Sequence, residues 1–367
     1  MSPPNDGSEN LARHVRVCLV SYPYSSSATT GRGLDRYTFE LAEHLKARCE
    51  NVSLRLVDQG PSRTIPVAGK KLGGFVVNLL KARADVYHAI SPLGGAMSIA
   101  LGRAPLVVTI HDVIPFNVDA RFDSPVKYRF WRQCIRTCIQ KSAAIIVPYQ
   151  VTRDEIVSRL GGDPSRVFVV NHGVDHGKYF SRPELARTPD RVVYLGEVSR
   201  SKGVDVLMRA FAIVKKAVPA AELVIAGKRS KDEQMLEELS RSLGVSGMTL
   251  KGYIAEQELP DYYATATAMV FPSRCGFGLS TLEAMACGTP VVVARALDAP
   301  EFIADAGLLS DPDSPEDLAR HLIRVLTDAR LRAELSEKGI ARAREFSWAR
   351  MALETERVYR RVLAGSL

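Results

Sequence analysis

Long apolar segments are missing from this sequence, and so are the usual cysteine motifs. None of the apolar runs in its 367 residues approaches the roughly 20 residues that span a membrane. The six cysteines show no CxxC spacing of the kind that zinc and redox sites use, so we expect them to be reduced. The polar start MSPPNDGSEN lacks the apolar core of a secretory signal peptide, which predicts a cytoplasmic chain.

Modules that read nucleic acids are missing as well. The sequence contains no zinc-finger spacing, no aromatic RNA-binding signature and no basic tail, so we expect no nucleic acid partner. It is nevertheless basic, because 49 lysines and arginines outnumber 41 aspartates and glutamates, which gives a formal charge of +8. Such a charge favours an anionic partner, such as nucleotide phosphates, an acidic glycan or anionic lipid.

What the sequence does contain is a regular alternation of apolar strands and amphipathic helices. This order is typical of parallel sheets with crossover helices, and the chain is long enough for two such domains. It predicts an α/β fold of two Rossmann-like units that face a central cleft. After Pro315 we expect two or three helices, broken near Gly339 and Phe346. The expected order is a flexible leader (1–13), a first unit (14–175), a linker (176–190), a second unit (191–345) and a terminal helix (346–367).

The stretch PSRCGFGLSTLEAMACGTPVVVA, residues 272–294, carries the strongest local pattern. It predicts a strand end, a loop with Gly276 and Gly278, a short helix from Leu279 and a second buried strand. Glycines let backbone N–H groups approach a ligand, and a helix N-terminus attracts anions. Glu283 would lie one helical turn behind this predicted anion site.

Two further segments place polar residues at the carboxyl ends of predicted strands, where ligands bind in such sheets. Lys202 precedes Gly203 and a helix, so its charge would add to an N–H cradle, with a solvated surface lysine as the alternative. His111 ends the apolar strand VVTIH, and a capping or core histidine is the alternative to a functional one. The glycine loop before Leu34 does not match GxGxxG, so a plain strand-to-helix turn fits it equally well.

A basic helix is predicted over residues 125–142. It sets five lysines and arginines beside Phe130 and Trp131. Together with a helix predicted over residues 70–83, it could form a membrane-surface or lipid-linked acceptor face. We favour an ordinary amphipathic helix with a solvated basic side, because the peripheral helices of such sheets are amphipathic.

The motifs together resemble those of a known enzyme family. The matching segments include GRGLDRYTFELAEHL, VVTIHDVIPF, VVNHGVD, VVYLGEVSRSKGVDVLMRAF, LVIAGK, LKGYI and VFPSRCGFGLSTLEAMACGTPVVVA. They span nearly the whole chain and resemble the family 4 retaining glycosyltransferases of the GT-B fold, also described as glycosyl transferases group 1. The resemblance implies a hexosyltransferase of polysaccharide biosynthesis. Such an enzyme would move a hexose of mannose or glucose type from a nucleotide diphosphate sugar to a hydroxyl of a glycan or lipid-linked glycan.

The resemblance also implies roles for the two units and for single residues. The second unit would bind the nucleotide-sugar donor, the first would bind the acceptor, and the terminal helix would cross back to the first. Lys202 would hold the donor diphosphate and stabilise charge on the leaving phosphate, while His111 would approach the transferring sugar. Glu283 would accept hydrogen bonds from the donor ribose. The implied donor-binding residues are Gly33, Arg200, Lys202, Ile254, Gly276, Phe277, Gly278, Leu279 and Glu283.

No general base, cofactor or essential metal is expected. Retaining members of the family are described as front-face enzymes that need no protein base, unlike the two-carboxylate glycosidases. The sequence has no Asp-x-Asp string at the place where a metal-dependent transferase would use one. The nucleotide diphosphate sugar would be a co-substrate, and a peripheral contact with the inner membrane face stays open.

Two positions depart from the family pattern. Glu197 stands where many members have an arginine that assists the lysine, and Arg200 is the nearby candidate to replace it. Cys275 stands where the family usually has a glutamate that contacts sugar hydroxyls, in a loop that is one residue short. A thiol cannot replace a carboxylate that accepts two hydrogen bonds. The alternatives are therefore a nucleotide-sugar-binding protein with weak or no transfer, or an accessory subunit docked on a membrane or a partner.

Overall fold

A computed structural model shows two compact units, each built around its own parallel sheet. Unit 1 comprises Met1–Gly173 and Trp348–Leu367, and unit 2 comprises Val174–Ser347. The structure describes residues 14–22, 33–58, 68–117, 124–230, 232–273, 278–296 and 298–366.

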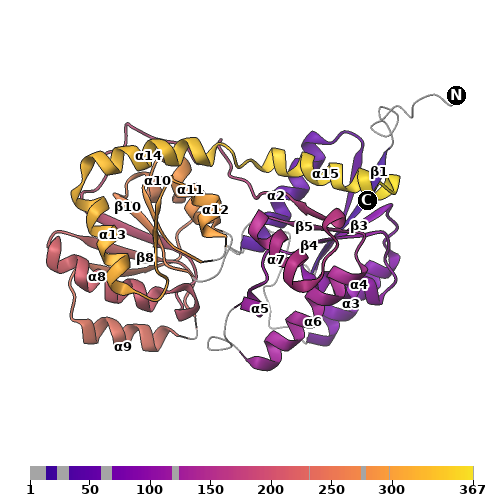
Figure 1. The fold of residues 1–367 in the computed structure, drawn as a ribbon, viewed down its shortest axis with the longest axis horizontal. Coiled ribbons are helices and arrows are strands. Elements are labelled where there is room, and N and C mark those ends of the chain that lie inside the picture. The colour runs from indigo at the N-terminus through magenta and orange to yellow at the C-terminus, as the bar shows by residue number, and fades with distance from the viewer. Residues whose placement is uncertain are drawn as a thin grey trace. The chain divides into compact units, whose positions relative to one another are not determined.

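The described residues of unit 1 form a six-stranded parallel sheet with the order β2-β1-β3-β4-β5-β6 (Figure 1). Its central strands are short and buried along their whole length, because helices cover both faces of such a sheet. The strands are β1 (Val15–Ser21), β2 (Val52–Asp58), β3 (Val86–Ala89), β4 (Leu106–Thr109), β5 (Ala144–Val147) and β6 (Val167–Val169).

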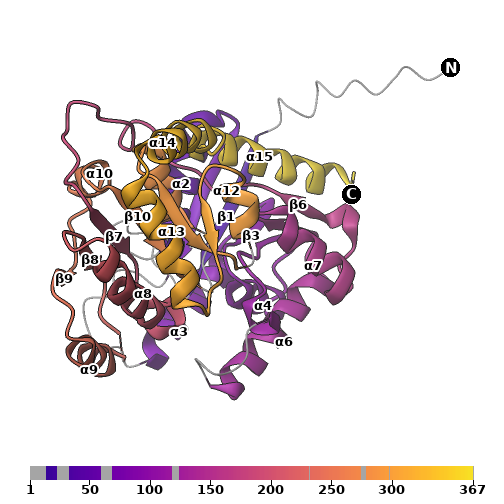
Figure 2. The ribbon, with the colours of Figure 1, turned by 60° about the vertical axis from the view of Figure 1, so that its left-hand side comes forward.

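Helices follow the strands of unit 1, including one that the sequence pattern did not predict. That helix is α4 (Pro92–Ala100), which starts at Ser91, whose side chain accepts a hydrogen bond from the Gly94 N–H. In Figure 2 α4 lies beside α6, and the two pack against each other. The other helices are α2 (Gly33–Arg48), α3 (Ala68–Lys81), α5 (Ile114–Asn117), α6 (Pro125–Lys141), α7 (Gln150–Leu160), the 3-10 turn η3 (Pro164–Arg166) and α15 (Trp348–Ala364).

The C-terminal helix α15 belongs to unit 1, where it packs against α2 and β5. A buried polar chain ties it to the sheet. The hydroxyl of Tyr359 lies 2.7 Å from Nδ1 of His88 on β3, and Nε2 of His88 lies 2.7 Å from the Thr109 hydroxyl on β4. Because each of these polar groups has a partner, their burial does not leave a donor or acceptor unpaired at these contacts.

The described residues of unit 2 form a second six-stranded parallel sheet, with the order β12-β11-β10-β7-β8-β9. In chain order this is the doubly wound Rossmann arrangement 3-2-1-4-5-6, and the strand order reverses between β7 and β10. The strands are β7 (Arg191–Leu195), β8 (Glu222–Ala226), β9 (Met248–Gly252), β10 (Ala268–Phe271), β11 (Val291–Ala294) and β12 (Leu308–Ser310).

The helices of unit 2 cover its sheet, and α13 packs against α8 (Figure 2). A core of aliphatic and aromatic side chains, with Phe211 and Leu322 fully buried, fills the space under these two helices. The helices are the 3-10 turn η4 (Arg200–Lys202), α8 (Val204–Ala217), α9 (Glu233–Leu243), α10 (Leu259–Ala264), α11 (Leu279–Ala286), α12 (Ala299–Ile303), α13 (Pro315–Thr327) and α14 (Ala329–Ala343).

Two details differ from the sequence-based expectation. The predicted break near Gly339 is wrong, because α14 runs through this residue, which packs against Met285 of α11. The break lies instead at Asp328, whose side chain caps α14 through the Leu331 N–H. The expected linker, residues 176–190, belongs to unit 2. There the Arg187 guanidinium donates hydrogen bonds to the carbonyls of Ala266, just before β10, and Gly288, just before β11.

Candidate active site

The most informative place in unit 2 is the switch point between β7 and β10. The chain leaves β7 outward to β8 and β9 and then returns to β10 on the other side of β7. The turns after β7 and β10 therefore leave the same edge of the sheet side by side, and open α/β sheets bind ligands at such a point. The first turn contains η4 and leads into α8, and the second begins at Pro272 and leads into α11.

The two turns approach so closely that only glycine fits between them. Gly203 has a φ of +70°, and a Cβ atom at this position would lie 2.1 Å from the carbonyl oxygen of Pro272. Gly278, which caps α11, has a φ of +65°, and its Cβ would lie 2.4 Å from the ring of Phe302. Both glycines thus combine a left-handed backbone with a close contact that a side chain would prevent.

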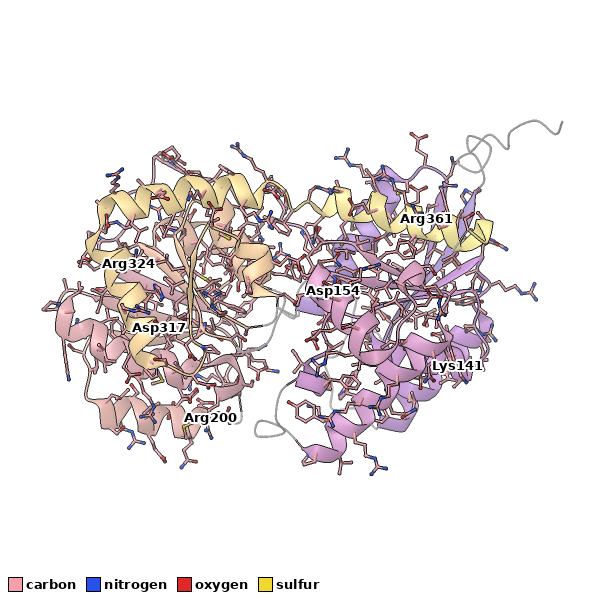
Figure 3. All side chains as sticks on the ribbon, viewed as in Figure 1. Lys141, Asp154, Arg200, Asp317, Arg324 and Arg361 are labelled. Atoms are coloured by element: carbon pink, nitrogen blue, oxygen red, sulfur yellow. The ribbon has the colours of Figure 1, made fainter. Side chains whose placement is uncertain are left out.

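The turn after β7 carries the predicted cations. Arg200, labelled in Figure 3, has its backbone N–H bonded to Asp232 at the start of α9, 2.9 Å away, while its side chain is half exposed. Lys202 is partly buried in η4, directly before Gly203 and the N-terminus of α8. Glu197, which stands where the family usually has an arginine, has an exposed side chain. Its carbonyl accepts a hydrogen bond from the Tyr194 hydroxyl at 2.8 Å. Arg200 and Lys202 thus place two cations beside the N-terminus of α8, where Nε of Arg200 also lies 3.9 Å from a carboxylate oxygen of Asp205.

The turn after β10 leads to a buried carboxylate. Although Glu283 carries a carboxylate, it is only 6% exposed, and its immediate neighbours on α11 are apolar and fully buried. The hydroxyl of Tyr263 on α10 donates a hydrogen bond to Oε2 of Glu283 at 3.1 Å. Burying a carboxylate is costly unless it is hydrogen-bonded, so this position is typical of a functional residue.

Some of the remaining residues of unit 2 that were predicted to bind the donor lie within the part of the chain that the structure describes, and others do not. Leu279 is the first residue of α11, and Ile254 follows β9 and is buried. Cys275, Gly276 and Phe277 lie outside the described residues, and their roles stay predictions.

In unit 1 the predicted catalytic residue His111 lies in a buried aromatic cluster. Its Nε2 lies 3.1 Å from the Ile90 carbonyl oxygen, and its Nδ1 lies 3.4 Å from Nε2 of His172. Because a carbonyl only accepts, Nε2 of His111 carries the proton, and Nδ1 accepts from His172. The His111 ring also stacks on His172 and meets the edge of Tyr37. Its predicted approach to a sugar stays a prediction.

Burial keeps this cluster uncharged. Desolvation lowers the pKa of His111 to about 3 and lowers that of His172 well below its usual value. Desolvation, together with the nearby His111, likewise lowers the pKa of His88 to about 3. These imidazoles are therefore neutral at neutral pH, which suits hydrogen bonding and not charge stabilisation.

Two partners in these sites were not predicted from the sequence. His172 lies 61 residues from His111, and its only sequence signal was its place in the NHGVD segment. Tyr263 lies 20 residues before Glu283, on a short helix with no motif of its own. Gly33 begins α2, and the residues before it are not described.

No helix among the described residues is long and apolar enough to cross a membrane. Among the same residues, no group of three or more His, Cys, Asp or Glu side chains could hold a metal ion.

Comparisons with known proteins agree with this architecture. The profile of the family described as "Glycosyl transferases group 1" matches residues 176–342, and that of "Glycosyltransferase Family 4" matches residues 31–178. A D-inositol 3-phosphate glycosyltransferase of Nocardioides is 30% identical over 90% of this chain and 80% of its own length. The O-antigen chain mannosyltransferase B of Escherichia coli is 27% identical over 69% of this chain and 70% of its own length.

Solved structures show the same fold. The sucrose-phosphate synthase of Thermosynechococcus elongatus matches with a TM-score of 0.81 at 21% identity, over 96% of this chain and 100% of that one. Anabaena HepE, in complex with UDP and glucose, matches with a TM-score of 0.74 at 19% identity, over 96% of this chain and 100% of that one. The two parallel sheets with their helices thus define an α/β protein of the GT-B class. The chain belongs to the family 4 glycosyltransferases and is a glycosyltransferase enzyme.

The buried histidines of unit 1 predict a stability that falls in mild acid. Their folded-state pKa values lie below the unfolded value of about 6.5, so the unfolded chain binds more protons as the pH falls below that value. Each histidine should therefore lower the free energy of unfolding by up to about 1.4 kcal/mol per pH unit. Both tryptophans, Trp131 and Trp348, belong to unit 1, so denaturation followed by tryptophan fluorescence reports on this unit.

Matched variants separate the buried histidines from other groups. His172→Asn should reduce the slope between pH 6.5 and 5, whereas His14→Gln, at an exposed position before β1, should leave it unchanged. A free energy of unfolding that stays level over this range would contradict the assigned burial.

The close approach of the two turns predicts an unusual cost for Gly203→Ala. The left-handed backbone alone costs about 1–2 kcal/mol for a residue with a side chain. The clash with Pro272 should add to this loss and displace the turn that carries Lys202, so affinity for a nucleoside diphosphate should fall about tenfold or more.

Gly244→Ala is the matched control, since Gly244 has a φ of +59° with nothing within 4 Å of the added Cβ. Circular dichroism and calorimetric titration compare the two variants. Equal losses of stability in both variants, with unchanged nucleotide affinity, would rule out the proposed contact between the turns.

Proposed function

We propose that this glycosyltransferase is a retaining hexosyltransferase. It moves a hexose of mannose or glucose type from a nucleoside diphosphate sugar to a hydroxyl of a glycan or lipid-linked glycan. The observation that carries the proposal is the switch point of unit 2, with Lys202 on one turn and the buried Glu283 behind the other. Relatives that are named mannosyltransferase and inositol phosphate glycosyltransferase, and the UDP and glucose in the HepE structure, support it.

Each part of this edge has a chemical task in the proposal. Lys202 and the N–H groups at the starts of α8 and α11 neutralise the donor diphosphate, whose leaving phosphate gains negative charge during transfer. Glu283 accepts hydrogen bonds from the ribose hydroxyls, and Ile254 meets the base through its backbone. Arg200 adds positive charge where the family's usual arginine is replaced by Glu197. Unit 1 holds the acceptor, with His111 next to the transferring sugar.

The reaction needs no further group from the protein in this proposal. The leaving phosphate takes the acceptor proton as in a front-face transfer, so no protein general base, cofactor or metal is assigned. The nucleoside diphosphate sugar is the co-substrate.

The donor site predicts a nucleotide-specific stabilisation. In a thermal-shift panel of UDP-, GDP- and ADP-hexoses, one base should stabilise the protein, because a ligand at 100 times its Kd adds about 2.7 kcal/mol. Lys202→Ala should weaken that ligand about tenfold to a hundredfold, as expected for the loss of a charged hydrogen bond.

Lys216→Ala is the control for this prediction, since Lys216 is exposed at the opposite end of α8. If Lys202→Ala binds as well as wild type, the diphosphate site lies elsewhere. Mass spectrometry of acceptor glycans then separates the transferase from the alternative, a nucleotide-sugar-binding protein without turnover. Binding without any glycosylated product would favour the alternative.

We further propose a cytoplasmic enzyme with a peripheral membrane contact, which would suit a lipid-linked acceptor. The first turns of α6 support it, because Val126 is 76% exposed and Phe130 51% exposed beside Lys127 and Arg129. Apolar side chains flanked by cations are typical of segments that lie on anionic lipid. Later in the helix, Arg132 and Arg136 turn to the Phe116 ring of α5.

The membrane contact predicts flotation with vesicles that contain phosphatidylglycerol, but not with pure phosphatidylcholine. Binding should weaken as salt screens the cations, and Phe130→Ser should reduce it severalfold. Phe180→Ser is the control, because Phe180 is similarly exposed beside an arginine but lies in unit 2. Equal flotation of both variants, or none at low salt, would remove this proposal.

A further inference from the structure

The hydrogen bond between Tyr263 and Glu283 joins two helices that flank β10. Tyr263 lies on α10 and is fully buried, and its hydroxyl lies 3.1 Å from Oε2 of Glu283 on α11. The two helices pack against each other. The carboxylate is therefore held by a side chain from the neighbouring helix, next to the switch point of the sheet.

Stability alone does not explain why unit 2 contains this buried pair of Tyr263 and Glu283. Replacing a buried polar pair by apolar residues of similar size is often neutral or stabilising, because the charge no longer has to leave water. Unit 2 nevertheless keeps a carboxylate at a position whose helical neighbours are leucine, alanine and methionine. A buried acid in this setting, beside a predicted anion site, indicates a functional demand on its position.

Tyr263 is well suited to hold that acid in one orientation. Its backbone carbonyl accepts a hydrogen bond from the Thr289 hydroxyl at 2.7 Å, and its ring contacts the rings of Tyr179 and Tyr262. Burial, and then the nearby charge of Glu283, raises the pKa of Tyr263 well above its usual value. The phenol therefore stays protonated at every working pH and is a permanent donor.

We propose that Tyr263 is a positioning residue that orients the Glu283 carboxylate to accept hydrogen bonds from the ribose hydroxyls of a nucleoside diphosphate. This inference rests on the proposed function, in which Glu283 meets the ribose. A carboxylate offers about four lone-pair sites, so it can accept bonds from a phenol and from ribose hydroxyls at the same time. Fixing the carboxylate in advance removes the cost of ordering it when the ligand binds.

The test measures recognition of the ribose hydroxyls and not affinity alone. Calorimetric titration gives the Kd of the nucleoside diphosphate (UDP, GDP or ADP) that stabilises the protein most, and the Kd of its 2′,3′-dideoxy analogue. In wild type the analogue should bind more weakly, and the ratio of the two constants defines the ribose preference. Tyr263→Phe should lower this preference about threefold to tenfold, the size expected for one hydrogen bond.

Tyr262→Phe is the matched control. The Tyr262 hydroxyl donates to the carbonyls of Tyr194 and Val224, both at 3.0 Å, and not to Glu283. Its loss should leave the ribose preference unchanged. A purely structural Tyr263 would weaken both ligands equally, so an unchanged ratio in Tyr263→Phe would overturn the proposal.

Glu283→Gln distinguishes this inference from the proposed function. If Glu283→Gln leaves the ribose preference intact, Glu283 does not meet the ribose, and both fail. If Glu283→Gln abolishes the preference and Tyr263→Phe does not change it, only the positioning role fails. Should Tyr263→Phe not fold because one bond to the buried carboxylate is lost, the double variant with Glu283→Gln removes the charge of that carboxylate. The proposal then expects the double variant to match Glu283→Gln, and any further change in the ratio would overturn it.

Discussion

The contact between Gly203 and Pro272 is the constraint on which the candidate site depends. The strand order of unit 2 places β7 beside β10, so the two turns that leave these strands must share one edge. A Cβ atom at position 203 would lie 2.1 Å from the Pro272 carbonyl oxygen, and glycine therefore sets how closely the turns can approach. With the turns in contact, the N-termini of α8 and α11 lie at the same edge of the sheet, where the proposed function sets the donor diphosphate.

The two units use buried polar residues in opposite ways. In unit 1 the histidines at positions 88, 111 and 172 lie in the interior with lowered pKa values, and their neutral rings link strands and α15. In unit 2 the buried Glu283 accepts a hydrogen bond from a phenol and lies on α11, whose preceding turn leaves the sheet beside the turn with Lys202. A neutral network acts through hydrogen bonds, whereas a held carboxylate presents negative charge to a polar ligand. This contrast agrees with a division of labour in which unit 2 binds the donor.

Much of the fold could be predicted from the sequence, because its signals are local. Strand and helix periodicity indicated two α/β units, and the glycine-rich stretch from Pro272 to Ala294 indicated a strand, a loop and a helix. The short helix α4 was missed because its glycines and small residues show no amphipathic stripe. Gly339 was misinterpreted as a helix break because its close approach to Met285 is a tertiary contact.

The candidate site was predictable only for residues that carry a motif. Lys202 and Glu283 stand in recognisable strings, and the structure shows Lys202 on the turn after β7 and Glu283 on α11, the helix that follows the turn after β10. Their partners depend on contacts that cross between elements, as Tyr263 does to Glu283 and His172 to His111. No local spacing encodes such pairs. Cys275, which departs from the family pattern, lies outside the described residues, so its effect on sugar binding stays a matter for experiment.

Hydrogen–deuterium exchange with and without a nucleoside diphosphate tests the central claim most directly. We predict that one and the same ligand slows the exchange of backbone amides in two separate peptides of unit 2. One peptide covers residues 199–206 and the other covers residues 278–284. Because these peptides are far apart in sequence and meet only through the strand order, their joint protection would locate the ligand at the switch point. Protection confined to unit 1, or to one of the two peptides alone, would contradict it.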